Sequence, residues 1–396
     1  MSVERVGVVG AGTMGSGIAQ LACLGGFETA LHDPLPEALA TGVDGLNAGL
    51  AKGAGRGLWA ADAAAAAAAR LRAETSLDGL AGCDLVIEAA PEDLDLKREL
   101  FRTLETLCGD EAILATNTSS LSVTAIAAAL EHPGRCCGMH FFNPPPLMKL
   151  VEIVAGDETE AATLGAAGDV AVAMGREPIR AADGIGFLAN RLVRPFTLEG
   201  LRLLADGVAE FDEIDRICRR AGFRMGPFEL IDLVGVDVNL AVAKSFWEQS
   251  FHEPRWQPSP LQARLVAAGR LGRKSGHGFY DYREGSHRRD NRESAEPLDL
   301  DAALSDPWDD SPEGAVLGRI LAQIVNEAHF ATAAGVGTRT DADKAMRLGF
   351  NWPRGPFEWG EAIGMRRAVA ILDDLWEERR EERYRVAPSL RQAAVA

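Results

Sequence analysis

Short apolar runs alternate with longer amphipathic segments over the first part of the chain. Each run is five to seven residues long, as in RVGVVG, and is typical of a buried β-strand. The segments between the runs carry apolar residues at helical spacing. The runs lie at residues 5–10, 27–33, 84–89, 112–116, 136–142 and 149–154. Strands that alternate with helices predict a parallel, doubly wound α/β sheet.

Long amphipathic helices replace this alternation from about residue 183, which predicts a mainly helical second part. A repeat lies within it, because residues 190–235 align with residues 318–364. The tetrapeptide GPFE occurs in both copies after a one-residue insertion in the second. Two further pairs match, namely Arg191 with Arg319 and Asp215 with Asp343. This self-similarity predicts two tandem repeated helical domains.

Four parts therefore follow from the pattern. We expect an α/β domain over 1–182, a first helical copy over 183–284, a linker over 285–311 and a second helical copy over 312–396. The linker is expected because this stretch is charged and rich in Ser, Asp and Pro.

Composition narrows the class of protein. The 396 residues carry a formal charge of −17, which argues against partners such as nucleic acid or an anionic membrane surface. A local basic pocket for a phosphorylated ligand is still compatible with this charge. The six cysteines lack metal-ligand spacing, so we expect no metal and mostly buried, reduced thiols. No signal peptide pattern and no membrane-length apolar run occur, so we expect a cytoplasmic protein.

A glycine-rich turn follows the first apolar run and opens the first helix. The sequence Gly10-Ala-Gly12-Thr13-Met14-Gly15 has the spacing of a dinucleotide fingerprint, with Asp33 at the end of the next strand. Asp33 would accept hydrogen bonds from the ribose hydroxyls and repel a 2′-phosphate, so NAD is favoured over NADP. The alternative is a plain glycine turn. We expect a Rossmann-type NAD-binding domain.

His140 and Glu152 lie on either side of a proline-rich turn, within two apolar runs. They could be isolated polar residues of a core, or the turn could bring the carboxylate to the imidazole. In an NAD-dependent alcohol oxidation a histidine can take the hydroxyl proton, and a carboxylate can orient it and stabilise its charge. We therefore interpret the pair as a candidate catalytic dyad.

Several motifs together resemble the (S)-3-hydroxyacyl-CoA dehydrogenases. They are GAGTMGSGIA, EAAPEDLDLK, TNTSSLS, HFFNPPPLMKLVEIV, GFLANR and GPFELIDLVG, in this order along nearly the whole chain. The resemblance implies that His140 is the base, Glu152 its partner, and Ser119 and Asn190 contacts of the substrate. It also implies cofactor contacts at Asp33, Glu92, Lys97, Ser119 and Asn143. An exposed charge pair at a helix start is the alternative for Glu92 and Lys97.

The resemblance also gives the repeat a meaning. Asn190 aligns with Gly318, so the second copy should be non-catalytic and could replace a partner subunit's domain, as in multifunctional β-oxidation enzymes. We expect a pseudo-dimeric monomer or a homodimer. Lys52 is a candidate contact for an acyl-CoA substrate, although an exposed, solvated lysine is the alternative. A carrier-protein thioester, a free hydroxy acid, and an NAD-binding regulatory protein without turnover are the competing interpretations.

Overall fold

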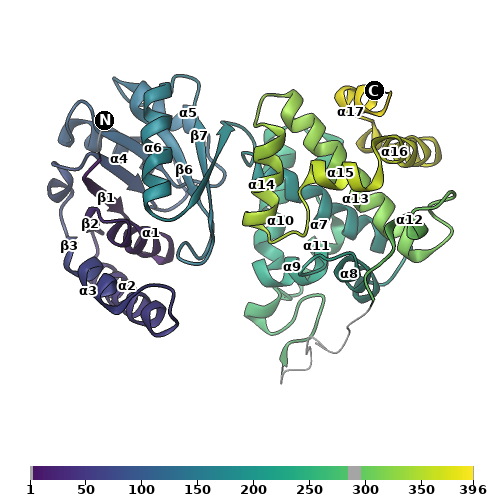
Figure 1. Ribbon diagram of the computed structural model, residues 1–396, viewed down its shortest axis with the longest axis horizontal. Coiled ribbons are helices and arrows are strands. Elements are labelled where there is room, and N and C mark those ends of the chain that lie inside the picture. The colour runs from purple at the N-terminus through teal and green to yellow at the C-terminus, as the bar shows by residue number, and fades with distance from the viewer. Residues whose placement is uncertain (1–2, 284–295, 396) are drawn as a thin grey trace. The chain divides into compact units, whose positions relative to one another are not determined.

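The computed structural model describes residues 3–283 and 296–395. These residues form two compact units, and the chain passes from one to the other between Phe187 and Leu188 (Figure 1). The expected linker falls partly on residues 284–295, which lie outside the described residues. The remainder of it is not open chain, because Leu304 and Trp308 are buried.

An eight-stranded sheet forms the centre of the first unit, with the strand order β3-β2-β1-β4-β5-β6-β7-β8. The strands are short and mostly buried, as their apolar sequences predict. They are β1 (Arg5–Val9), β2 (Glu28–His32), β3 (Leu71–Glu74), β4 (Leu85–Glu88), β5 (Ile113–Thr116), β6 (Cys136–Phe141), β7 (Leu150–Ala155) and β8 (Glu177–Ala182). The edge strands β3 and β8 were not expected from the sequence.

Helices connect the strands of this unit; most of them pack against the sheet, whereas α3 packs on α1 and α2 (Figure 1). They are α1 (Thr13–Leu24), α2 (Pro36–Gly55), α3 (Ala61–Ala69), α4 (Leu94–Leu107), α5 (Val123–Ala127) and α6 (Ala161–Ala173). The chain between β2 and β3 forms two helices, α2 and α3, with a turn over residues 56–60 between them. The indole of Trp59 packs where a Cβ atom on Gly53 would lie.

The sheet is not wholly parallel, which corrects the expectation from sequence. Strands β1 to β6 all run parallel to one another. Strand β7 runs antiparallel to β6, and β8 runs parallel to β7. The cause is the short, proline-rich connection over residues 142–149, since a parallel crossover needs about a dozen residues or more. The turn pairs His140 directly with Glu152 in the strand register.

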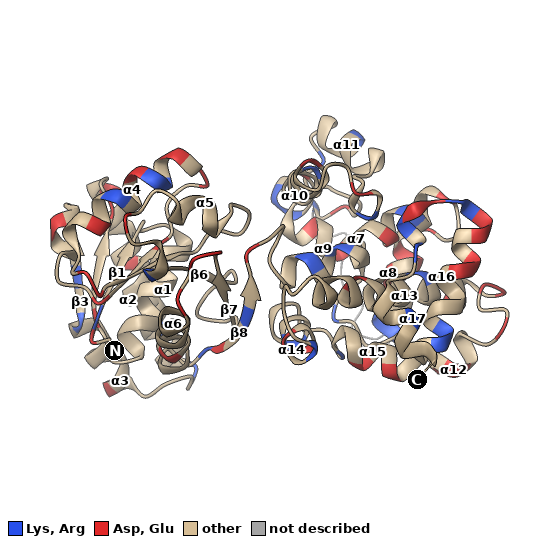
Figure 2. Ribbon diagram, turned by 90° about the horizontal axis from the view of Figure 1, so that it is seen from above, with Lys and Arg blue, Asp and Glu red and all other residues tan. Residues whose placement is uncertain are grey.

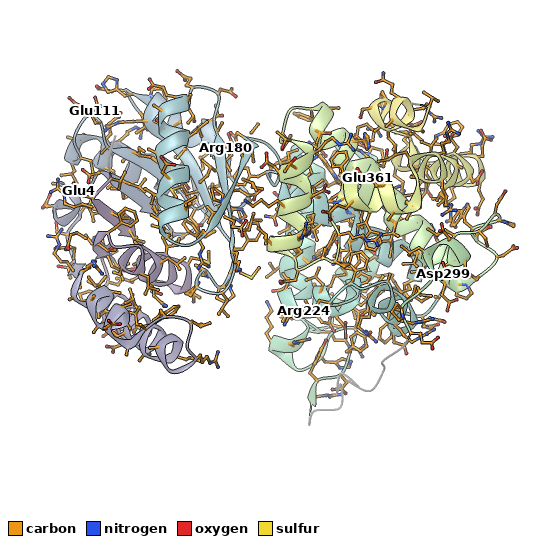
Figure 3. The ribbon with its side chains drawn as sticks, viewed as in Figure 1. Glu4, Glu111, Arg180, Arg224, Asp299 and Glu361 are labelled. Atoms are coloured by element: carbon orange, nitrogen blue, oxygen red, sulfur yellow. The ribbon has the colours of Figure 1, made fainter. Side chains whose placement is uncertain are left out.

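The loops that carry the candidate residues leave the sheet at the end where most of its strands terminate. The carboxyl ends of β1, β2, β4, β5 and β6 all lie there, and β7 starts at the same end. Glu4 and Glu111, just ahead of β1 and β5, mark the opposite end of these strands in Figure 3. Ligands of such sheets bind beyond the carboxyl ends of the strands.

The second unit is helical. It contains α7 (Ala189–Ala205), α8 (Phe211–Arg220), α9 (Pro227–Val234), α10 (Val236–Gln249), α11 (Pro260–Ala267), α12 (Leu300–Ala303), α13 (Pro312–Ala333), α14 (Arg339–Gly349), α15 (Pro356–Ile363), α16 (Met365–Arg379) and α17 (Pro388–Val395). The long, buried helices α7 and α13 pack against each other at its centre (Figure 1).

Two pairs of helices in this unit are joined by the same hydrogen bonds. Asp215 of α8 accepts from the backbone N–H of Phe228 (2.9 Å) and of Glu229 (2.8 Å) at the start of α9. Asp343 of α14 likewise accepts from the N–H of Phe357 (2.7 Å) at the start of α15. Each carboxylate thus caps a helix that begins with the sequence GPFE.

Charged residues of both signs are interleaved on both units, as along α4 and α16 in Figure 2. All six cysteines are buried free thiols, which confirms the expectation from sequence. Within residues 3–283 and 296–395, no helix has the length and apolar character needed to cross a membrane.

Candidate active site

The glycines between β1 and α1 have different structural tasks. Gly10 has a φ of +95°, and a Cβ atom on it would lie 2.6 Å from the carbonyl oxygen of Ala89. A Cβ atom on Gly15 would overlap the carbonyl oxygen of Gly10 at 1.7 Å. A Cβ atom on Gly12, by contrast, would meet nothing within 4 Å. The fold itself requires the first and third glycines, whereas the second borders open space that suits a pyrophosphate.

The first turn of α1 adds donors to this space. Thr13 and Met14 begin the helix, and the N-cap residue Gly12 provides no side-chain hydrogen bond to its first turn. Backbone N–H groups and the positive end of the helix dipole at such a position favour a phosphate. The residues present therefore fit the pyrophosphate of NAD.

Asp33 connects this loop to the end of β2. One carboxylate oxygen accepts from the N–H of Ala11 (2.9 Å) and the other from the N–H of Leu35 (3.0 Å). Each oxygen keeps further acceptor capacity for a ribose hydroxyl. The carboxylate thus fixes the glycine loop and presents negative charge beside it.

Lys97 is buried near the same carboxyl end of the strands. Its side chain is 1% exposed, and its ammonium nitrogen lies 2.5 Å from Glu88 Oε1 and 3.4 Å from Glu92 Oε2. The alternative of an exposed charge pair is therefore wrong for Lys97. Sequence reasoning missed Glu88, which is fully buried at the end of β4. Its position at the carboxyl end of a strand was the available signal.

Glu92 organises the loop that carries Ser119. One of its oxygens, Oε1, accepts from the Thr118 hydroxyl (2.5 Å) and from the N–H groups of Ser119 (3.0 Å) and Ser120 (3.2 Å). Burial alone would raise the pKa of Glu92, but the bond from Thr118 and the charge of Lys97 outweigh burial, and the pKa is lowered. A charged carboxylate therefore holds the loop while the Ser119 side chain stays exposed.

His140 and Glu152 are in direct contact. Nδ1 of His140 lies 2.7 Å from Oε2 of Glu152, and the two side chains are 7% and 0% exposed. The rings of Phe142 and Phe187 lie 4.7 and 5.7 Å from the imidazole, centroid to centroid. Asn117, which sequence reasoning also missed, accepts from the N–H of Phe141 (2.8 Å) and fixes the end of β6. The arrangement leaves Nε2 as the imidazole nitrogen for a substrate proton.

The remaining candidates of the first unit are exposed. Asn143 follows the carboxyl end of β6, ahead of a cis peptide bond to Pro144. Lys52 lies in the last turn of α2 and is exposed. Neither position distinguishes a ligand contact from a solvated side chain.

Asn190 belongs to the second unit, where it is half-buried in the first turn of α7. Its aligned residue Gly318 lies in α13 under the ring of Trp308, and a Cβ atom there would be 2.6 Å from that ring. Among the described residues, no group of three or more His, Cys, Asp and Glu side chains could hold a metal ion.

Models of both domains of one enzyme family match the chain. The NAD binding domain of 3-hydroxyacyl-CoA dehydrogenase matches residues 5–184, and the C-terminal domain of 3-hydroxyacyl-CoA dehydrogenase matches residues 186–282 and 314–396. The chain belongs to the 3-hydroxyacyl-CoA dehydrogenase family. This membership confirms the resemblance seen in the motifs, NAD as the cofactor, and NAD-dependent 3-hydroxyacyl-CoA dehydrogenase as the enzyme class.

Individual relatives agree with the family. The 3-hydroxyadipyl-CoA dehydrogenase of Escherichia coli K12 is 37% identical over 100% of this chain and 98% of its own length. The 3-hydroxybutyryl-CoA dehydrogenase of Clostridioides difficile is 38% identical over 70% of this chain and 99% of its own length. A crystal structure titled 3-hydroxybutyryl-CoA dehydrogenase from E. coli K12 matches with a TM-score of 0.90 and 35% identity, covering 100% of this chain and 99% of that one.

Proposed function

We propose that His140 and Glu152 form the catalytic dyad of this NAD-dependent 3-hydroxyacyl-CoA dehydrogenase. The observation that carries the proposal is the 2.7 Å contact between Nδ1 of His140 and Oε2 of Glu152. A carboxylate on Nδ1 fixes the tautomer in which Nε2 has the free lone pair. It also stabilises the imidazolium that forms when Nε2 accepts a proton.

The chemistry assigned to the dyad is a proton transfer. Nε2 of His140 takes the proton of the C3 hydroxyl, and the oxygen becomes the carbonyl of the 3-oxoacyl product. NAD, when bound, accepts the hydride that leaves C3. In the reverse direction the imidazolium returns the proton to the oxygen. The buried Glu152 carboxylate supports both directions, because it orients the imidazole and stabilises its charged form.

Other candidates are given supporting roles. Ser119 and Asn190 would hold the reacting oxygen, and Asp33 would bind the adenosine ribose beside the glycine loop.

Glu92 and Asn143 would contact the cofactor. Lys97 is better placed to act through Glu92, since its ammonium group is enclosed by Glu88, Glu92 and the carbonyl oxygen of Ala90. Lys52 would meet a phosphate of CoA.

We further infer that the helical unit consists of two tandem copies with pseudo-twofold packing. Two reciprocal ion pairs support this. Arg191 of α7 bonds Glu327 of α13 (2.6 Å), and Arg319 of α13 bonds Glu199 of α7 (2.7 Å). The aligned residues, 191 with 319 and 199 with 327, are 128 positions apart in both cases. A self-complementary contact of this kind is the signature of a twofold axis.

The second copy then takes the place of a partner subunit's domain. The C. difficile relative is matched over almost its whole length by 70% of this chain, so this chain has a further part. Gly318 supplies no side chain for a substrate, so the second copy is assigned a structural task. A monomer with an internal pseudo-dimer is the proposed state, with a homodimer as the alternative. The six buried free thiols are consistent with a reducing, cytoplasmic location.

The proposed substrate is an (S)-3-hydroxyacyl-CoA, oxidised reversibly to the 3-oxoacyl-CoA. One relative is named for a dicarboxylic acyl group, 3-hydroxyadipyl, and another for 3-hydroxybutyryl. A free hydroxy acid and a carrier-protein thioester are the competing substrates. An NAD-binding regulatory protein would have no use for the buried His140–Glu152 contact.

The direct test is NADH formation by the purified chain. Short and medium (S)-3-hydroxyacyl-CoAs, the same acyl groups on acyl carrier protein, and free 3-hydroxy acids should be compared by kcat/KM. We expect the CoA thioesters to be preferred strongly. Preference for a free acid would contradict the proposal, as would binding of NADH without turnover of any of these compounds.

A further inference from the structure

Arg194 is a buried cation in α7. It is 7% exposed, and its Nε and Nη1 atoms have no hydrogen-bond partner among the described residues. Its guanidinium carbon lies 5.8 Å from the centroid of the Phe246 ring. Burial lowers the pKa of Arg194 to about 10, so the group is still charged at neutral pH. A buried charge without a hydrogen-bonded counter-ion is costly, which calls for a functional reason.

Two other arginines of the helical unit are paired, the buried Arg319 and the part-buried Arg255. Arg319 is 2% exposed and bonds the carboxylates of Glu199 and Asp206. Arg255 bonds Glu327 in the same way. The fold therefore supplies carboxylates to its structural arginines, and Arg194 differs from them.

The second helical copy shows which polar residues the fold needs. Arg191 and Glu199 have polar counterparts there, as the reciprocal ion pairs show. Asn190 and Arg194 are replaced by the small residues Gly318 and Ala322 in the buried part of α13. The ring of Trp308 packs on Gly318 in that copy. The repeated fold thus does not depend on Asn190 and Arg194, and both occur only in the copy that is assigned a substrate.

Arg194 lies one helical turn beyond Asn190 on the same face of α7. Residues four apart are separated by about 6 Å along the axis, and helical side chains lean toward the N-terminus. The Arg194 side chain starts one turn beyond Asn190 on this face, and its guanidinium lies over the ring of Phe246. In a six-carbon 3-hydroxy dicarboxylic acyl group, only C4 and C5 separate the C3 carbinol from the terminal carboxylate.

We propose that Arg194 binds a carboxylate at the far end of the acyl chain, which makes dicarboxylic 3-hydroxyacyl thioesters the substrate class. The inference rests on the proposed function, because it takes Asn190 to hold the C3 oxygen. A guanidinium bonds a carboxylate through two parallel N–H···O bonds, and the ligand then supplies the counter-ion that the protein lacks. Arg194 would determine specificity and take no part in the proton transfer.

The test compares two thioesters of equal chain length, (S)-3-hydroxyadipyl-CoA and (S)-3-hydroxyhexanoyl-CoA. The unmodified chain should prefer the dicarboxylic one in kcat/KM, on the order of 10- to 100-fold. Arg194→Met should abolish the preference, and Arg194→Lys should retain part of it. Arg264→Met removes the same charge from an exposed position on α11 and should leave the preference intact. Thermal unfolding of each variant shows whether it has folded.

Two results would overturn the inference. One is the absence of a preference in the unmodified chain, and the other is an unchanged preference in a folded Arg194→Met variant, whether or not its kcat/KM falls equally on both thioesters. If Arg194→Met does not fold, the preference of the unmodified chain and its partial retention in Arg194→Lys test the inference instead. If the unmodified chain oxidises neither thioester, the proposed function itself fails, and this inference with it.

Discussion

At the scale of single residues, Asp33 has a structural task, and we propose that it also selects the cofactor. Its carboxylate accepts from the N–H groups of Ala11 and Leu35, and it presents negative charge where the adenosine ribose is expected. We predict that NAD exceeds NADP strongly in kcat/KM. Asp33→Ala should lower the kcat/KM for NAD on the order of 10- to 100-fold, because bonds to a charged group are lost, and should narrow the ratio between the cofactors.

Steady-state kinetics with both cofactors measure this ratio. Asp33→Asn is the second variant, since it removes the charge and keeps one oxygen that can still accept from a backbone N–H of the loop. A ratio that narrows in both variants assigns the selectivity to charge. Comparable efficiency with NAD and NADP in the unmodified chain would contradict the assignment.

The sequence alone indicates residues whose signal is local. The spacing of Gly10, Gly12 and Gly15 and the turn between His140 and Glu152 can be seen without a structure. Glu88 has only a weak local signal, its position at the carboxyl end of a strand, and Arg194 has none. What makes them unusual is burial together with the presence or absence of a partner, and these depend on residues far away in the chain.

At the scale of elements, the proposed function gives α7 and α13 different tasks. Asn190→Ala in α7 should lower kcat on the order of 100-fold if the amide holds the reacting oxygen in the transition state. Gly318→Asn at the aligned position in α13 must displace Trp308, so it should cost about 1–3 kcal/mol of stability by overpacking. Turnover per folded molecule should then change little.

Thermal unfolding and active-site titration of both variants separate stability from turnover. A large catalytic loss in a fully folded Gly318→Asn variant would mean that the second copy takes part in the reaction. The same measurement on Asn190→Ala would refute the substrate role of Asn190 if kcat stayed at the level of the unmodified chain.

The spacing of apolar residues predicted which segments are strands and which are helices, but it did not predict the directions of the strands in the sheet. Strands β1, β2 and β4 to β7 were predicted, because each is a distinct apolar run. The antiparallel direction of β7 depends on the length of the proline-rich turn, which strand periodicity does not encode. The weakly apolar strand β3, LRAE, carries almost no sequence signal because it lies at the edge of the sheet and is partly exposed.

At the scale of the whole molecule, the chain divides where the hydrophobic period changes. The family models follow the same division, with the NAD binding domain ending at residue 184 and the C-terminal domain beginning at residue 186. The packing of α7 on α13 could not be predicted with the same ease, since it joins helices more than a hundred residues apart. Of the two proposals, the tandem copies and the dyad, the dyad bears more directly on the activity.

The most direct measurement is single-turnover hydride transfer by the intact chain carrying Glu152→Gln, His140→Gln or both. Glu152→Gln keeps the shape of the side chain and removes the charge that stabilises the imidazolium. We predict a loss on the order of 10²–10⁴ in the rate of hydride transfer, and at least as large a loss for His140→Gln. The double variant should be little slower than His140→Gln, because the two groups act as one unit. Losses that multiply independently, or a folded Glu152→Gln variant with an unchanged rate, would contradict the dyad.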